Sequence, residues 1–156
     1  MRRAQPLGLA LSTLMLATAG CDSPDGGGGS GCGSGTMTAT VGGASFSATC
    51  VTGSFSNGLL SVGGNLGATQ GGAQEQITMA LPGATAGGTV TLGFGPTATY
   101  AKVVGTDASQ TYVSTSGSVR LTSVSETAAK GTFSFTGRNN AGTTISIANG
   151  AFDLTF

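Results

Sequence analysis

Three cysteines are the residues of this chain whose type and spacing point to chemistry. Cys21 follows a short apolar stretch, and Cys32 and Cys50 come 11 and 29 residues after it. The chain has no histidine, so it lacks the commonest general base and the commonest metal ligand. No metal site is expected, because neither a histidine nor a fourth cysteine can complete a zinc shell. Cys32 and Cys50 also lack the Cys-x-x-Cys spacing of redox-active thiols.

The segment before Cys21 predicts export. Arg2 and Arg3 precede a largely apolar stretch at residues 7–19, and small residues lead up to Cys21. A secretory apolar region spans about 7 to 15 residues, whereas a membrane-spanning helix needs about 20. We therefore predict a signal peptide over residues 1–20. The segment resembles the signals of bacterial lipoproteins, and this resemblance implies lipidation of Cys21, by diacylation of its sulfur and acylation of its amine with chains such as palmitate.

The lipid would explain the odd number of cysteines. With Cys21 acylated, Cys32 and Cys50 remain as a pair in an exported, oxidising compartment, where a disulfide is expected. Its loop of about 18 residues would contribute roughly 3 kcal/mol in the chain-entropy account. The alternative is two independent thiols.

The chain after Cys21 divides into a tether and a domain. Residues 21–35 are rich in Gly and Ser and predict a lipidated flexible tether, with a typical reach of about 20 Å. Residues 36–156 predict one β-rich domain, because apolar residues alternate, glycines are frequent and no helical period occurs. We expect an antiparallel meander of about 9–10 short strands, forming a β-sandwich or a flattened barrel.

Turn residues predict which strands pair. Gly42-Gly43 would pair Ala39 with Phe46, and Asn149-Gly150 would form a type I′ hairpin that pairs Ala148 with Ala151. The strand after this second turn and the three strands before it would then share two apolar ladders, Val119-Phe135-Ile145-Leu154 and Leu121-Phe133-Ile147-Phe152. The opposite face of these strands would be polar, with Arg120, Ser134, Ser146 and Asp153.

Two further hairpins are predicted in the middle of the chain. The apolar residues Ile77, Met79 and Leu81 would pair with Phe94, Leu92 and Val90. Residues 97–104 would pair with residues 110–115, so that Tyr100 lies opposite Tyr112 and Lys102 projects on the same face.

Two stretches of the domain carry a resemblance. Residues 131–139 and 149–154, with their alternating phenylalanines, look like the C-terminal part of β-rich domains of uncharacterised function on bacterial lipoproteins, and residues 36–46 are similar to the way those domains begin. The resemblance implies a β-rich fold and no particular activity.

Composition argues against several function classes. The chain from Cys21 onward has four basic and six acidic residues, a net charge near −2, so nucleic acid is not an expected partner. The carboxylates are scattered (Glu75, Asp107, Glu126, Asp153), and no spacing recommends a catalytic pair. No nucleophile motif surrounds the lysines, so we expect neither catalysis nor a cofactor.

The sequence therefore predicts a protein of the bacterial cell envelope, periplasmic or surface-facing, attached to a membrane through Cys21. Its expected role is that of a non-catalytic structural or interaction module with an envelope protein or glycan as partner. The alternative is a barrel that binds a small ligand or a glycan. The candidate ligand-binding residues are Tyr100, Lys102 and Tyr112. An internal cavity of about 300 Å³ or more, lined by Met79, Leu92 and Phe94, would favour the alternative.

Overall fold

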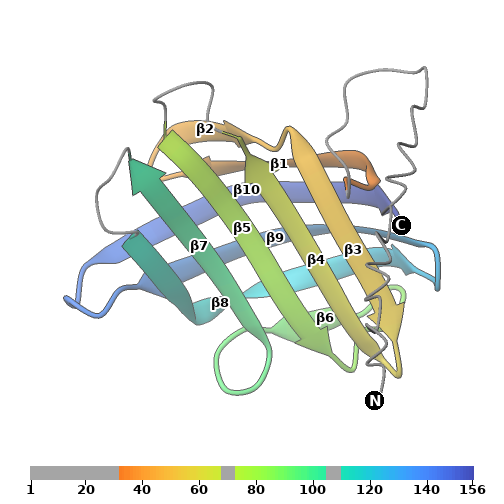
Figure 1. Cartoon of the computed structure of the whole chain (residues 1–156). Helices are drawn as coiled ribbons and strands as arrows, with labels where there is room; N and C mark the ends of the chain where they lie inside the picture. Colours follow the sequence, from red (N-terminus) through yellow and green to blue (C-terminus); the bar gives the residue numbers. More distant parts are fainter. Residues whose placement is uncertain (1–31, 68–72, 105–109) are drawn as a thin grey trace, which may run out of the picture.

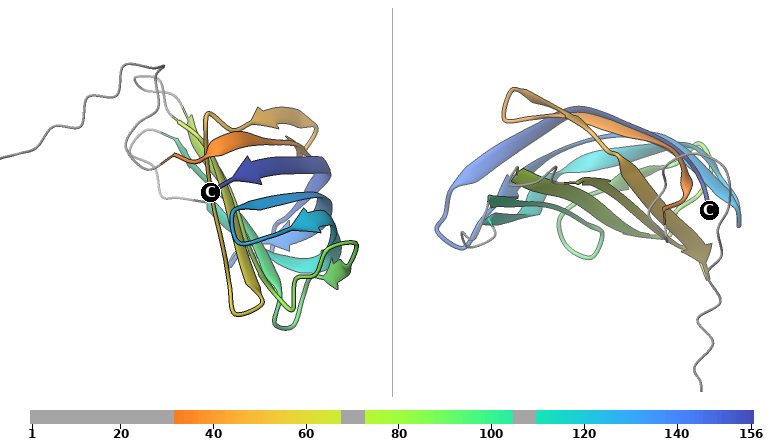
Figure 2. Two further views of the ribbon diagram at one scale, coloured as in Figure 1. Left: turned by 90° about the vertical axis from the view of Figure 1, so that its right-hand side faces the viewer. Right: turned by 45° about the horizontal axis from the view of Figure 1, so that its top comes forward.

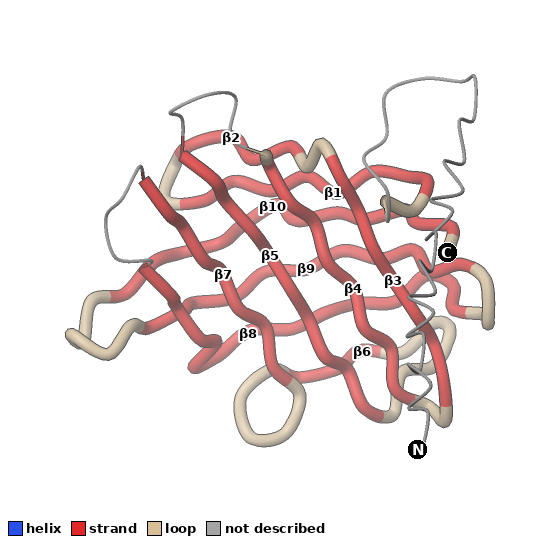
Figure 3. The backbone as a smooth tube through the Cα atoms, in the orientation of Figure 1, coloured by secondary structure: helices blue, strands red, loops and turns tan. Residues whose placement is uncertain are grey.

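The computed structural model describes residues 32–67, 73–104 and 110–156, and these residues confirm the predicted all-β fold (Figure 3). Across these ranges no helix is long and apolar enough to cross a membrane. The predicted signal peptide and Cys21 lie outside the described residues. The strands are β1 (Ser34–Val41), β2 (Ala44–Ser47), β3 (Cys50–Ser56), β4 (Leu59–Leu66), β5 (Ala73–Pro82), β6 (Thr89–Thr91), β7 (Thr97–Val104), β8 (Gln110–Val124), β9 (Ala128–Arg138) and β10 (Thr144–Thr155).

All ten strands belong to one antiparallel sheet that curls into two layers. Its order is β2-β1-β10-β9-β8-β7-β5-β4-β3, and the short β6 pairs with β8. In Figure 1, β3, β4, β5 and β7 run steeply down the front of the molecule, and β1, β10, β9 and β8 cross behind them. Figure 2 shows the two layers from the right-hand side of Figure 1 and with the top of the molecule tilted toward the viewer. The fold is thus a half-barrel formed by a single sheet.

Strand β8 carries the sheet from one layer to the other. Its first residues pair with β7, as in Thr99 with Val113, and its later residues pair with β6, as in Val90 with Val119. Between these parts the register against β9 shifts, and Gly117 has a φ of 138°. A Cβ atom at Gly117 would collide with the Ser134 carbonyl oxygen, so the bend requires glycine.

The core lies between the two layers. Alternate residues of each strand face inward, as the period of two requires, and large apolar side chains from both layers are buried there. Gly64 marks a close approach of the layers, because a Cβ atom there would come within 2.6 Å of the Met37 sulfur. The outward positions Arg120, Ser134, Ser146 and Asp153 are exposed, as predicted.

Two predicted hairpins are confirmed. Gly42 and Gly43 have positive φ angles of 56° and 91°, and they join β1 to β2 with Ala39 opposite Phe46. Strands β7 and β8 pair with Tyr100 opposite Tyr112.

The hairpin predicted at Asn149-Gly150 is wrong, because both residues lie inside the continuous strand β10. Asn149 has a φ of 50°, and the register against β9 shifts here, so that Ile147 pairs with Phe135 and Gly150 with Phe133. The left-handed residue forms a bulge in place of a turn. The bulge keeps apolar residues on both sides of it facing the core. The two four-strand ladders are consequently wrong in register and in their fourth member.

The pairing predicted for the segment around Phe94 is also wrong. Strand β5 pairs with β4 and β7, placing Met79 opposite Val62 and Ala98, whereas β6 leaves this layer and pairs with β8. Leu92 is buried, but Phe94 is fully exposed in the loop between β6 and β7. The alternation of apolar residues in β5 does not determine which strand pairs with it. The strand that follows β5 in the chain is β6, but β7 is the one that lies beside it.

Candidate functional site

The predicted disulfide between Cys32 and Cys50 is confirmed. The Cα atoms are 5.2 Å apart, within the usual range for a disulfide. The bond joins the residues just before β1 to the first residue of β3, where the two edges of the curled sheet meet. The N–H of Gly33 donates to the Val51 carbonyl at 2.6 Å beside it. Both edges are therefore fastened at one corner, covalently and by a backbone hydrogen bond.

The two tyrosines predicted to bind a ligand lie in the core. Their rings are tilted with centroids 6.1 Å apart, and only 2 % of Tyr100 and 7 % of Tyr112 is exposed. The exposure on which the predicted patch depends is not found, because the even-numbered residues of β7 and β8 face inward here. A binding role for these tyrosines stays a prediction.

Lys102 also points inward and is paired. Its ammonium lies 2.9 Å from the Glu75 carboxylate, and the hydroxyl of Tyr112 donates to the Gln110 side-chain oxygen at 3.1 Å. Burial, followed by the negative charge of Glu75, raises the pKa of Tyr100 above its ordinary value. Tyr100 therefore stays protonated at physiological pH. We interpret these residues as the polar end of the core, in which the charged and hydrogen-bonding groups have partners.

Among the described residues, no group of three or more His, Cys, Asp and Glu side chains lies together as a metal site requires. Asp153 forms an exposed ion pair with Lys130, at 2.6 Å between oxygen and nitrogen. Glu126 lies exposed between β8 and β9, and Asp107 lies outside the described residues.

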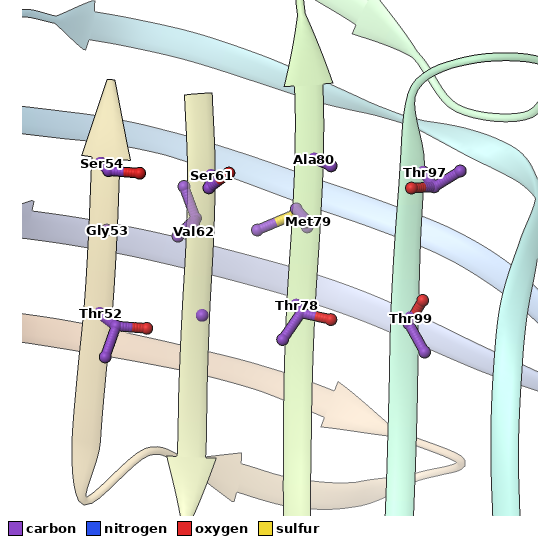
Figure 4. A pocket seen from close by; sticks show the side chains of 11 residues that line it. Thr52, Gly53, Ser54, Ser61, Val62, Thr78, Met79, Ala80, Thr97 and Thr99 are labelled. Atoms are coloured by element: carbon purple, nitrogen blue, oxygen red, sulfur yellow. The ribbon is translucent and has the colours of Figure 1, made fainter. Parts of the chain in front are cut away.

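The outer face of the front layer carries a regular array of hydroxyl groups, which we call the hydroxyl face. Figure 4 shows these side chains on four adjacent strands. Register aligns them in two rows across β3, β4, β5 and β7. One row is Thr52, Gly63, Thr78 and Thr99, and the other is Ser54, Ser61, Ala80 and Thr97.

The rows enclose a shallow depression of about 370 Å³ that opens to solvent. Gly63 forms part of its floor. A side chain would not fit there, because a Cβ atom would come within 2.8 Å of the Thr52 hydroxyl oxygen. Met79 borders this depression, Leu92 is in the core and Phe94 is exposed, so these three residues do not line a common cavity. A second depression, of about 450 Å³, lies on the back layer beside Arg120.

The hydroxyl face carries no charge within the described strands. The charged residues of β5 and β7 are Glu75 and Lys102, and both face the interior. Serine and threonine hydroxyls each donate one hydrogen bond and accept others. Such a surface suits a neutral, polar partner, whereas a phosphate or carboxylate would find no counter-charge. The sequence signal of this face is the small and hydroxyl residues at every second position of the strands (Thr-x-Ser, Ser-x-Gly, Thr-x-Thr). The predicted pairings depended on the apolar residues between them, and this face was not predicted.

The fold and this face define a small all-β domain with an uncharged, hydroxyl-lined outer surface. Residues 34–153 match the protein family described as "Domain of unknown function (DUF6252)". The match covers more than half of the chain, so the chain belongs to this family, in agreement with the predicted uncharacterised domain family. No curated protein and no solved structure matches the chain.

Proposed function

We propose that this protein is a non-catalytic interaction module of the bacterial cell envelope, attached to a membrane through lipidated Cys21. The observation that carries the interaction role is the hydroxyl face, which presents six hydroxyl side chains in two rows over four strands without a charge. The anchor is supported by the arginines, the short apolar stretch and the small residues before Cys21.

The anchor has a direct test. Replacing Cys21 with Ser is expected to release the protein from the membrane fraction, because two or more acyl chains supply the stable attachment. Fractionation of cells, followed by mass spectrometry of the N-terminal peptide, measures both the attachment and the lipid. If the processed Cys21→Ser protein still sediments with membranes, the anchor is wrong.

Glycan binding is a second candidate function, favoured by the chemistry of the hydroxyl face. Neutral sugars offer hydroxyls that exchange hydrogen bonds with serine and threonine, and the depression at Gly63 lets a ligand approach the backbone. The face lacks the exposed aromatic rings on which sugars often stack, so specificity would depend on hydrogen bonds.

Thr78→Lys places a long charged side chain at the centre of the hydroxyl face. We expect this variant to weaken binding to neutral envelope oligosaccharides at least about tenfold, equivalent to about 1.4 kcal/mol. Ser45→Lys, at an exposed position of β2, is the matched control. Isothermal titration of both variants and the parent measures the difference. Equal affinities for all three proteins, or no binding by the parent, would exclude the glycan function and leave the anchored module.

A further inference from the structure

The loop between β6 and β7 presents a phenylalanine to solvent in a defined conformation. Phe94 is fully exposed, and its neighbours Gly93 and Gly95 have positive φ angles of 147° and 99°. The N–H of Gly93 donates to the carbonyl of Pro96 at 3.0 Å, which closes the loop. Leu92 is buried and its N–H donates to the Gly117 carbonyl at 2.9 Å, which fixes the start of the loop on β8. Phe94 is therefore held outward by the structure around it.

Two segments without charged residues meet at the end of the molecule that carries Phe94, and Arg120 of β8 lies opposite Thr89 in one of them. The β3–β4 hairpin reaches the same end, as the light green loop and the lower ends of β3 and β4 show in Figure 1. Leu59 in this hairpin is 44 % exposed, and the N–H of Gly83 donates to the Gly58 carbonyl at 2.8 Å, which ties the hairpin to the segment after β5. Residues 51–66 and 82–97 contain no charged residue.

An exposed aromatic ring in a segment without charged residues matches the chemistry of a bilayer interface. Phenylalanine and leucine enter the boundary between headgroups and acyl chains favourably, and the two segments that carry them contribute no charge that would have to be desolvated. The other described large apolar residue that is exposed, Val113, lies on the outer side of β8 opposite Thr99, near the start of β7 and so toward the same end.

The proposed lipid anchor favours the bilayer over any other partner of the Phe94 end. A lipid on Cys21 would keep the domain close to the membrane at all times, so that even a weak contact of the Phe94 end is populated through its high local concentration. Eleven residues lead from Cys21 to Cys32 and extend to at most about 40 Å. This length exceeds the roughly 27 Å of an eight-residue strand such as β4, so the lipid and Phe94 can reach the same membrane surface.

We propose that the end of the molecule that carries Phe94 and, in the β3–β4 hairpin, Leu59 inserts into the surface of the membrane to which the protein is attached, and so orients the domain. This inference rests on the anchor of the proposed function. The strands of the front layer, which lead away from the Phe94 end, then stand upright on the membrane. The hydroxyl face would point sideways, accessible to partners in the envelope.

The chain has no tryptophan, so a single substitution creates a site-specific reporter. We would substitute Phe94→Trp in the full lipidated chain and bind it to vesicles of phosphatidylcholine and phosphatidylglycerol. We expect the emission to shift to shorter wavelength and to be quenched by brominated acyl chains. Ser45→Trp, at an exposed position of β2 at the opposite end of the molecule in Figure 1, is the matched control and is expected to show neither change on the same vesicles.

The anchor and the insertion fail separately in this experiment. Loss of co-sedimentation of the unsubstituted chain with vesicles would contradict the anchor before any fluorescence is read. If the chain co-sediments but the Phe94→Trp variant emits as it does in the lipid-free Cys21→Ser background, the insertion is wrong. An emission shift of the Phe94→Trp variant that depends on protein concentration without vesicles would identify a second copy as the occupant, and it would also overturn the proposal.

Discussion

Replacing Phe133 with Ala is expected to lower the free energy of unfolding by about 3 to 5 kcal/mol. The ring is 4 % exposed and lies between Phe135 and Phe152, with centroid distances of 6.4 and 6.3 Å. It also covers Gly150 on the neighbouring strand, where no side chain can fill the space that the ring would leave. The substitution therefore removes buried apolar surface and leaves a cavity.

Phe94→Ala provides the matched control, since it removes the same side chain from a fully exposed position. Its effect on stability is expected to stay within about 0.5 kcal/mol. Urea unfolding of both variants, in the Cys21→Ser background so that lipid plays no part, gives the two free energies. Equal losses for the two substitutions would mean that Phe133 is not in the core.

Removing the disulfide by Cys32→Ser together with Cys50→Ser is expected to cost about 3 kcal/mol. The cross-link closes a loop that contains β1 and β2, and it joins the two edges of the sheet where they meet. Without it, the unfolded chain gains entropy and the corner at Gly33 depends on hydrogen bonds alone. Substituting both cysteines avoids leaving a lone reactive thiol.

Chemical reduction separates this effect from any harm done by the serines. A reducing agent is expected to destabilise the parent protein by the same amount and to leave the double variant unchanged. Urea midpoints with and without reductant measure both. A parent protein that is indifferent to reductant would show that the disulfide contributes nothing to stability.

Local features of the fold could be predicted from the sequence, because they depend on neighbouring residues. The alternation of apolar and polar residues identified most strands, and the paired glycines at Gly42 and Gly43 identified a hairpin and its register. Cysteine count and spacing led to the disulfide. The facing tyrosines followed from the expected loop length, but their burial depended on which face of the sheet became the interior.

The dipeptide Asn-Gly shows where local reasoning ends. At Asn57-Gly58 it makes a two-residue hairpin, with Ser56 opposite Leu59, and both residues have positive φ. At Asn149-Gly150 it makes a bulge, because β10 continues between β1 and β9, which hold it straight on both sides. Alternating apolar residues flank both dipeptides, so only the distant neighbours decide between turn and bulge.

The hydroxyl face could not be predicted for a related reason. Its residues are separated by turns and by the excursion through β6, and they form rows only because β5 lies between β4 and β7. The prediction that paired β5 with the segment around Phe94 placed Thr97 and Thr99 elsewhere. Because the wrong strand was placed beside β5, the hydroxyl face was not predicted.

The place of β1 in the sheet determines when the domain can fold. The first strand has β10, the last strand, as its principal partner, and Ser34 pairs with Thr155. The back layer is therefore incomplete until β10 is available. Contacts over such sequence separations form slowly, because the chain must first be brought together over its whole length. A ribosome or an export channel that releases the chain from its N-terminus would leave the back layer incomplete until β10 has emerged, and deletion of β10 would leave β1 without its main partner.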